Sequence, residues 1–469
     1  GKRECIGTVP TSKVVVSNLT IKDCFLMGGR GTLASDVEAS GVGPQVLNYV
    51  VSLQNITSED QWFTSNENIN ITGNRFFIKG GGALLVEGGR DVRITNNFMT
   101  TVWPEFGTYE PHNFGQNNFE NGVWQGICLT APQSLAVNQT GYGGPDAVQW
   151  AMQISGEVVI SNNNFEGQFS NTYVQAHNNY FPSCGWVFVA PNFISSAITV
   201  SSNNFVGDPF GRGGNLGLKG EGTFFGGGVT HLPTVTPISI QNNQFWGYRF
   251  GVQVQNGAES VISNNSFYNC QWGVWVGASF SGTEKYGDEW SKVDSAFSDA
   301  QHNPVGTLTI KSNTFSANVS APTFLKADEI TPTPSDDKSA IKFKGLEWGI
   351  INNNASRRFE VVIKDNVCTG IIGGTAHGLR HFIDFAEFSA ACGSSGGLPG
   401  NAQGTAIINR LIVSGNVLNH ISRTIIRASS GFVTPPVGND MSYGIWNMEF
   451  SNNSISGCGA WRIDKALVV

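Results

Sequence analysis

The chain has 469 residues, of which 13% are charged, and its formal net charge is −7. This sparse, mildly acidic charge lacks the basic footprint that binds nucleic acids or anionic membranes, so we expect neither as a partner. No apolar run reaches the roughly 18 residues of a membrane-spanning helix, so we expect no membrane insertion.

In chain order, the sequence repeats one phrase: a β-branched or other apolar residue, an Asn three positions later, and in most copies a large apolar residue two positions after that. Asn74 and Asn97 are 23 residues apart, and Asn243 and Asn265 are 22 apart. A period in the twenties with strand chemistry in each unit predicts a solenoid, because each repeat can bury its apolar face only against its neighbours. The twelve copies are Ile71/Asn74/Phe76, Ile94/Asn97/Met99, Phe114/Asn117/Phe119, Ile160/Asn163/Phe165, Ala176/Asn179/Phe181, Val200/Asn203/Phe205, Ile240/Asn243/Phe245, Ile262/Asn265/Phe267, Ile310/Asn313/Phe315, Ile363/Asn366/Cys368, Val413/Asn416/Leu418 and Phe450/Asn453/Ile455.

The unit between Asn243 and Asn265 shows how one coil is expected to be built. In the run 252–255 valine alternates with glutamine, which points Val252 and Val254 inward and the glutamines outward. A coil of this length has room for three short strands and three turns, as a parallel β-helix requires. The sequence therefore predicts an all-β solenoid, a parallel β-helix of about 12 or more coils with long loop insertions.

The repeat Asn is expected to have a structural role and not a catalytic one. Asn tolerates the left-handed backbone region that a tight bend between two strands requires. When coils stack, its side-chain amide can also donate to the carboxamide oxygen of the next copy. We therefore predict a ladder of asparagines along the solenoid.

We expect one elongated domain, because the repeat continues from near residue 70 to near residue 455. Residues 1–60 are predicted to form an N-terminal cap or the first coils, 61–458 the β-helix body, and 459–469 a C-terminal cap or a truncated end. Six stretches of the body are too long for tight turns and are predicted to be insertions, at 120–158, 206–237, 277–306, 317–350, 372–408 and 428–446.

Most of the eight cysteines are expected to be buried thiols. Cys184, Cys270 and Cys458 each follow a repeat Asn by five residues, so they would stack several coils apart, beyond the ~7 Å reach of a disulfide. Cys368 replaces the large apolar residue of its repeat. A disulfide between Cys5 and Cys24 is an alternative that the sequence leaves open, and so is a disulfide formed by Cys128 or Cys392. No Cys or His spacing typical of a metal site occurs, and we expect neither a metal nor another cofactor.

Four repeats read ISNNNF at 160–165, VSSNNF at 200–205, IQNNQF at 240–245 and ISNNSF at 262–267. They resemble the coils of right-handed parallel β-helix proteins of the pectin-lyase-like superfamily. With its large insertions, the chain is most similar to the body domain of a bacteriophage tailspike or polysaccharide depolymerase, over residues 65–458. The resemblance implies a right-handed helix, a homotrimer, an extracellular or virion-surface location, and a surface polysaccharide as the ligand.

The catalytic signatures of the polygalacturonases in that superfamily are missing, so catalytic candidates must come from local chemistry. Hydrolysis of a glycosidic bond needs two carboxyls, about 5 Å apart for retention and about 6.5–9.5 Å apart for inversion. The strand-like run 380–388 offers Asp384 and Glu387 as the catalytic pair. Alternation with apolar neighbours turns Asp384 outward, and a bend after Ala386 would bring Glu387 to the same surface. The alternative is that both are exposed charges with Arg380 as their partner.

Aromatic faces stack on sugar rings, and planar amides reach sugar hydroxyls. Gln253 and Trp275 each lie ten residues after a repeat Asn, in one outward register, so they would be neighbours on adjacent coils. Trp290 stands beside an acidic group in one insertion. The substrate-binding candidates are therefore Gln253, Trp275, Arg380 and Trp290. As an alternative, Trp275 packs against an insertion or another subunit.

These features predict a carbohydrate-active β-helix protein that binds a bacterial surface polysaccharide and is a candidate to hydrolyse it with paired carboxylates. A non-catalytic virion fibre or adhesin that binds a surface glycan is the first alternative. A secreted polysaccharide lyase is the second, since elimination needs a Lys, Arg, His or Tyr base beside a uronic acid. The sequence leaves open whether the chain is an enzyme.

Overall fold

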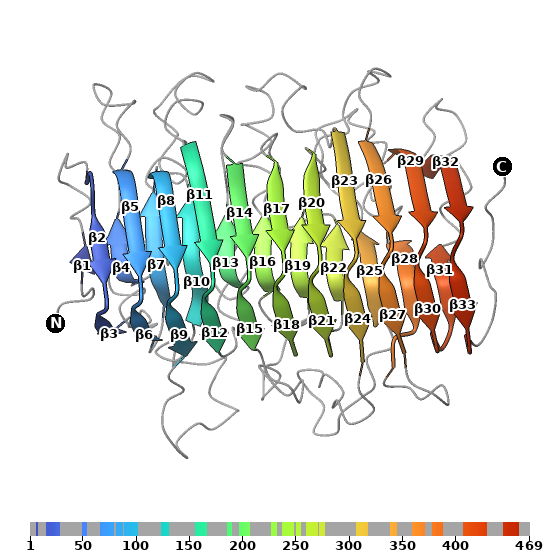
Figure 1. Cartoon of the computed structure of the whole chain (residues 1–469), viewed down its shortest axis with the longest axis horizontal. Helices are drawn as coiled ribbons and strands as arrows, with labels where there is room; N and C mark the ends of the chain where they lie inside the picture. The colour runs from blue at the N-terminus through green and yellow to red at the C-terminus, as the bar shows by residue number, and fades with distance from the viewer. Residues whose placement is uncertain are drawn as a thin grey trace, which may run out of the picture.

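The computed structural model is an all-β, right-handed parallel β-helix, drawn as a rod of stacked coils in Figure 1. Three parallel sheets of 11 strands each run along the rod, and we name them sheets A, B and C. The structure describes residues 6–7, 16–28, 49–53, 66–78, 81–87, 89–101, 123–130, 155–166, 185–189, 197–206, 227–231, 237–247, 250–254, 259–270, 272–276, 306–317, 338–344, 359–370, 378–387, 407–428 and 444–458. Within these ranges no helix has the length and apolar character to cross a membrane.

The strand bounds are as follows. Sheet A contains β1 (Ile6–Gly7), β4 (Tyr49–Leu53), β7 (Gly81–Glu87), β10 (Val123–Thr130), β13 (Gly185–Val189), β16 (Gly227–His231), β19 (Phe250–Val254), β22 (Trp272–Val276), β25 (Ser339–Lys344), β28 (His381–Glu387) and β31 (Thr424–Ala428). Sheet B contains β2 (Thr20–Lys22), β5 (Asn66–Thr72), β8 (Gly89–Thr95), β11 (Ser155–Ser161), β14 (Ala197–Ser201), β17 (Ile238–Gln241), β20 (Ser260–Ser263), β23 (Gly306–Lys311), β26 (Phe359–Lys364), β29 (Ile407–Ser414) and β32 (Gly444–Ser451). Sheet C contains β3 (Phe25–Gly28), β6 (Arg75–Ile78), β9 (Phe98–Thr101), β12 (Asn164–Glu166), β15 (Asn204–Val206), β18 (Gln244–Trp246), β21 (Ser266–Tyr268), β24 (Thr314–Ser316), β27 (Val367–Thr369), β30 (Val417–Asn419) and β33 (Ser454–Ser456).

Each coil contributes one strand to each sheet before the chain moves on to the next coil. Neighbours in a sheet are therefore three strands apart in the chain, as in β4, β7 and β10, and they pair in parallel. In Figure 1 the strands of sheets B and C run downward at the front, sheet A returns behind them, and the rod advances from left to right. This path is right-handed, the sense that parallel crossovers favour.

The described strands form eleven coils. Asn97 bonds directly to Asn163, and Asn163 bonds directly to Asn203. The predicted copies at Asn117 and Asn179 lie outside the described residues, and the coils on either side pair without them, so neither copy adds a coil. The first coil lies in the predicted N-terminal region, where a cysteine takes the Asn position.

The bend between sheets B and C uses positive φ one residue earlier than predicted. The residue before the repeat Asn is left-handed, with φ of 57°, 55° and 55° at Asn96, Asn162 and Asn264. The backbone N–H of Asn96 donates to the carbonyl of Ser161 in the next coil at 3.1 Å. The prediction that the repeat Asn itself takes this conformation was wrong.

The repeat asparagines form the predicted ladder. Asn243 Nδ2 donates to Asn265 Oδ1 at 3.0 Å, and the same Oδ1 accepts the Asn243 backbone N–H at 2.9 Å. Asn243 Nδ2 also donates to the Val200 carbonyl of the previous coil at 2.9 Å. From Asn97 to Asn416, each carboxamide therefore uses both of its N–H donors and both acceptor positions of its oxygen, as Asn243 does. The ladder runs through Asn74, Asn97, Asn163, Asn203, Asn243, Asn265, Asn313, Asn366, Asn416 and Asn453.

The core is filled by columns of like side chains stacked along the rod. On sheet C, adjacent phenylalanine rings of five successive coils have centroids 4.7 to 5.0 Å apart. The column consists of Phe165, Phe205, Phe245, Phe267 and Phe315. The two predicted inward valines, Val252 and Val254, are fully buried. Equivalent residues therefore lie one above another, as the repeat predicted.

Four of the predicted insertions contain a strand of sheet A: β10 in 120–158, β16 in 206–237, β25 in 317–350 and β28 in 372–408. Each of these stretches therefore returns to the rod. The repeat Asn marks only the bend between sheets B and C, so the strands of sheet A have no comparable marker in the sequence. The predicted terminal stretch 459–469 lies outside the described residues.

The cysteines that the structure describes follow the column pattern. Cys368 and Cys270 are buried, and burial raises the pKa of the Cys368 thiol. Cys24 and Cys458 are free thiols, so the pair of Cys5 with Cys24 is not formed. The structure does not describe the side chains of Cys5, Cys128, Cys184 and Cys392.

Candidate functional site

The outer face of sheet A gathers polar and aromatic side chains from four neighbouring strands, β22, β25, β28 and β31. One outward row follows the backbone register from Gln253 through Trp275, Lys342 and Asp384 to Arg427. A second row pairs Trp272, Ser339, His381 and Thr424, and Lys338 and Arg380 stand just before β25 and β28. We call the group the sheet A cluster, and it consists of Trp272, Trp275, Lys338, Ser339, Lys342, Arg380, His381, Asp384, Thr424 and Arg427.

Asp384 is the carboxylate of this cluster. Its neighbours Ile383 and Phe385 belong to the core, which confirms the predicted outward direction of Asp384 from the coil. Asp384 Oδ2 accepts a hydrogen bond from Ser339 Oγ at 3.4 Å and lies 3.7 Å from Arg427 Nη1. The expectation of an exposed charge was wrong, because the Asp384 side chain is 0% exposed, whereas that of Arg427 is 34% exposed.

The two tryptophans of β22 pack against each other and under a lysine. Trp272 and Trp275 meet edge to face with centroids 4.7 Å apart, separate from the core. Lys342 Nζ lies 4.4 Å from the Trp272 ring centroid and 5.8 Å from that of Trp275, a cation–π arrangement. Trp275 pairs with Gln253 as predicted, but it is only 2% exposed and is packed in place. Nothing is described of the Gln253 side chain.

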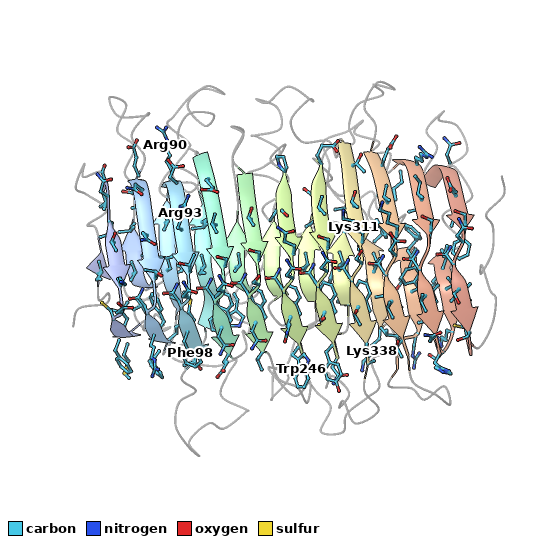
Figure 2. All side chains as sticks on the ribbon, viewed as in Figure 1. Arg90, Arg93, Phe98, Trp246, Lys311 and Lys338 are labelled. Atoms are coloured by element: carbon cyan, nitrogen blue, oxygen red, sulfur yellow. The ribbon has the colours of Figure 1, made fainter. Side chains whose placement is uncertain are left out.

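Lys338 and Arg380 occupy equivalent places just before β25 and β28. The backbone N–H of Arg380 donates to the Lys338 carbonyl at 2.9 Å, and both side chains are buried. Burial first, and the nearby Arg380 charge second, lower the pKa of Lys338 from 10.5 to about 8. This lysine can therefore give up its proton close to neutral pH. Figure 2 labels Lys338 on the rod.

A hydrogen-bonded pair of side chains lies beside these residues. His381 Nδ1 and Thr424 Oγ1 are hydrogen-bonded across adjacent strands, and both residues are buried. His381 also pairs in register with Ser339, the partner of Asp384. A carboxylate, hydroxyl groups and an imidazole therefore belong to neighbouring residues of β25, β28 and β31.

Trp275 and Asp384 lie in one row of the register, two strands apart, and the backbone of Gln253 pairs with Trp275. Arg380 stands just before β28, the strand that carries Asp384, and its side chain is buried. A β-bulge lies between Asp384 and Glu387, where the sequence predicted a bend, and the Glu387 backbone pairs with Lys344. The Glu387 side chain and all of Trp290 lie outside the described part of the chain.

Sequence reasoning missed the remaining members of the cluster. They are Trp272, Lys338, Ser339, Lys342, His381, Thr424 and Arg427. Each stands on a strand of sheet A, or just before one, where no repeat phrase fixes the register. The alternation of the short runs 339–344 and 424–428 was the one available signal, and it does not show which runs are adjacent.

Comparison of the chain with protein-family models gives no match, and comparison with curated proteins gives none either. Among the residues with described positions, no group of three or more His, Cys, Asp and Glu is placed to hold a metal ion.

Proposed function

We propose that this protein is a carbohydrate-active β-helix protein of the pectin-lyase-like superfamily. It binds a surface polysaccharide over the outer face of sheet A, in the manner of a tailspike. The observation that carries the proposal is the concentration of buried ionisable side chains in the sheet A cluster, outside the apolar core. An extracellular or virion-surface location belongs to the same proposal, because the ligand is found there.

Burying charge outside a core is costly, so the fold itself gives no reason for this cluster. Desolvating an ion costs several kcal/mol in practice, by order of magnitude, unless partners compensate for it. At the outward positions of sheet B in the middle coils, the same repeat uses Thr199, Ser239, Val261 and Thr309, none of which carries a charge. Strong desolvation with specific charge partners is typical of functional sites.

The charge of the cluster favours an acidic glycan. Lys338, Lys342, Arg380 and Arg427 carry positive charge, and Asp384 is the carboxylate among them. A sugar carboxylate would compensate this positive charge, and arginine binds carboxylates with two parallel hydrogen bonds. We therefore propose uronic acids or similar acidic units in the bound polysaccharide.

Asp384 and Glu387 are the proposed hydrolytic pair. The ion pair with Arg427 suits Asp384 to act as the carboxylate, either as a base toward water or as the nucleophile. Glu387 then acts as the acid that protonates the leaving oxygen. The bulge between them supports this assignment, because it changes the spacing along β28 at the position where the two carboxyls must converge.

The test is incubation with polygalacturonate, alginate, hyaluronan and bacterial capsule, followed by assays of reducing ends and of the absorbance of unsaturated uronates. We expect reducing ends without unsaturated product, and a loss of at least about 100-fold in Asp384→Asn and in Glu387→Gln, with binding retained. Asp365→Asn, an exposed carboxylate at a bend between sheets B and C, is the matched control. Unchanged turnover in both cluster variants would refute the assignment.

Elimination is the second candidate, and the lowered pKa of Lys338 supports it. A lysine with a pKa of about 8 is half neutral at pH 8, and its neutral form can remove the proton next to a uronate carboxyl. Neighbouring cations would stabilise the negative charge that develops on that carboxyl. Unsaturated product that disappears in Lys338→Met would establish this reaction in place of hydrolysis. Binding of an acidic polysaccharide without either product would establish the non-catalytic fibre or adhesin.

We also propose that three rods associate side by side. The first coils carry an exposed apolar group on sheet C, in which Phe25 is 62% and Met27 45% exposed. Phe25 stacks on Phe77 with centroids 4.6 Å apart. Association of copies would cover this group, as the tailspike resemblance implies.

A further inference from the structure

A second surface, on sheet C, carries an exposed aromatic pair. Trp246 of β18 and Tyr268 of β21 are in register on adjacent coils. Their rings stack with centroids 4.4 Å apart and planes inclined by 22°. Trp246 is 40% exposed, and Figure 2 shows it at the outer edge of sheet C, pointing away from the rod.

Short side chains lie on both sides of this pair. Trp246 is in register with Val206 of the previous coil, and Tyr268 with Ser316 of the next. Because the two rings stack on each other, their remaining faces turn toward Val206 and Ser316. Adjacent coils are about 4.8 Å apart, so each ring projects further from the rod than the smaller side chain on the neighbouring coil. The stacked pair therefore presents the outer face of the exposed Trp246 indole beside Val206, and Tyr268 supports the indole from the other side.

A row of uncharged polar residues runs beside the stacked pair on the same face. It consists of Asn164, Asn204, Gln244, Ser266 and Thr314, paired coil by coil. Asn204 Nδ2 donates to Asn164 Oδ1 at 2.9 Å, and Asn164 Nδ2 donates to Glu166 Oε1 at 2.9 Å. Glu166 is the one charged residue on this face among the described strands β12, β15, β18, β21 and β24, and it is engaged by Asn164.

We propose that this surface of sheet C is a second carbohydrate site, which takes an uncharged glycan. Sugar rings present C–H faces that pack on Trp and Tyr, and their hydroxyls suit the amides and hydroxyls of Gln244, Ser266 and Thr314. The described strands β12, β15, β18, β21 and β24 carry no cation on this face, which separates the site from the sheet A cluster. A glycan bound here packs one sugar ring against the exposed face of Trp246, with the polar row beside it.

The experiment is affinity electrophoresis of the full chain in gels containing dextran, xyloglucan, galactomannan or arabinoxylan. We expect at least one of these neutral polysaccharides to retard the protein. Trp246→Ala should weaken that binding at least about tenfold, Tyr268→Ala should also weaken it, and Trp246→Phe should retain part of it, because the aromatic face supplies the contact.

Val367→Ala is the matched control, since Val367 is an apolar residue on the same outer face and is 38% exposed. It should leave binding unchanged, and thermal unfolding should show that every variant is folded. The proposal is overturned if no neutral polysaccharide retards the chain, or if Trp246→Ala binds as the parent does. It is also overturned if Trp246→Ala changes the sedimenting mass instead of the binding, because the pair would then join copies of the chain. Any of these three results leaves the sheet A proposal standing, since that proposal rests on acidic polysaccharides and other residues.

Discussion

At the scale of single residues, two adjacent positions have different roles in the bend between sheets B and C. The first takes positive φ, and Asn, Ser, Asp or Gly fills it, as at Asn264. The second, such as Asn265, turns its carboxamide inward and bonds to the coils before and after it. The first position tolerates several residues because its demand is on the backbone alone. The second needs a side chain with two donors and two acceptor sites in a fixed plane.

Asn265→Ala should lower the free energy of unfolding by about 3 kcal/mol or more. The substitution removes the partners of the Asn243 amide and of the Ile240 carbonyl, and each unsatisfied buried group costs about 1–3 kcal/mol. Chemical denaturation followed by circular dichroism measures the change. Asn264→Gly is the control and should change stability by less than about 0.5 kcal/mol, since Gly adopts positive φ freely. Equal effects of the two variants would contradict this division.

Lys338 should make stability depend on pH above neutrality. Its pKa is about 8 in the folded chain, against an ordinary 10.5. Between these values the unfolded chain holds a proton that the folded chain has released, so the free energy of unfolding rises with pH, by at most about 1.4 kcal/mol per unit. Below pH 8 both states are protonated, and the cost of the buried charge is present in full.

Lys338→Met should therefore be stabilised relative to the parent at pH 7, and this advantage should shrink between pH 8 and 10.5. The arginine of Lys338→Arg stays charged throughout, so the free energy of unfolding of this variant should not rise between pH 8 and 10.5. At pH 7 this variant should be no more stable than the parent. Denaturation curves of the three proteins at several pH values measure the effect. A parent protein whose stability relative to Lys338→Met does not change across that window would show that the lysine is not desolvated.

At the scale of elements, the inward residues of the sheet A strands are matched in size to the side chains of the phenylalanine column on sheet C that they face. A Cβ on Gly273 would lie 2.5 Å from Phe315 Cε1 and 2.9 Å from the Ala340 carbonyl. One coil later the register puts Ala340 at the Gly273 position, and sheet C has Cys368 in place of Phe315. The pair of a very small and a large residue, Gly273 and Phe315, is thus replaced one coil later by two residues of intermediate size, Ala340 and Cys368. Because interiors are close-packed, the cross-section of each coil constrains such pairs jointly.

Gly273→Ala should lower the free energy of unfolding by about 1–3 kcal/mol through overpacking. Phe315→Cys alone should cost at least about 3 kcal/mol through the cavity it leaves. The double variant reproduces the Ala340 and Cys368 combination of the next coil, so it should be more stable than the sum of the single effects by about 1 kcal/mol. Unfolding of all four proteins closes this cycle. Strict additivity would mean that the two positions do not share space.

At the scale of the whole molecule, the rod presents three long faces with different character. Sheet A carries the buried charged cluster, and sheet C carries exposed aromatic groups at Phe25 and at Trp246. Sheet B shows ion pairs on its outer face, such as that of Arg410 with Glu449 at 3.7 Å. A solenoid lets each face change along its length, since each coil contacts only its neighbours.

Light scattering at micromolar concentration should give three times the mass of one chain. Phe25→Ser combined with Phe77→Ser should shift the protein toward the single-chain mass, because the exposed stack at the first coils would no longer favour contact. Val417→Ser, an exposed apolar residue of the same face near the other end, is the control. A single-chain mass for the parent protein would contradict the proposed trimer.

The sequence by itself determined the coil, the Asn ladder and the phenylalanine column, because a local phrase repeats at every bend between sheets B and C and its residues can only stack on their own copies. It also indicated Asp384 as outward, through alternation with Ile383 and Phe385. Only the tertiary structure decided which runs of sheet A are adjacent, and so placed Lys342 beside Trp272 and Arg427 beside Asp384. The physical reason is that stretches of differing length separate these strands, so their register is set by the backbone hydrogen bonds of neighbouring coils and by no spacing in the chain.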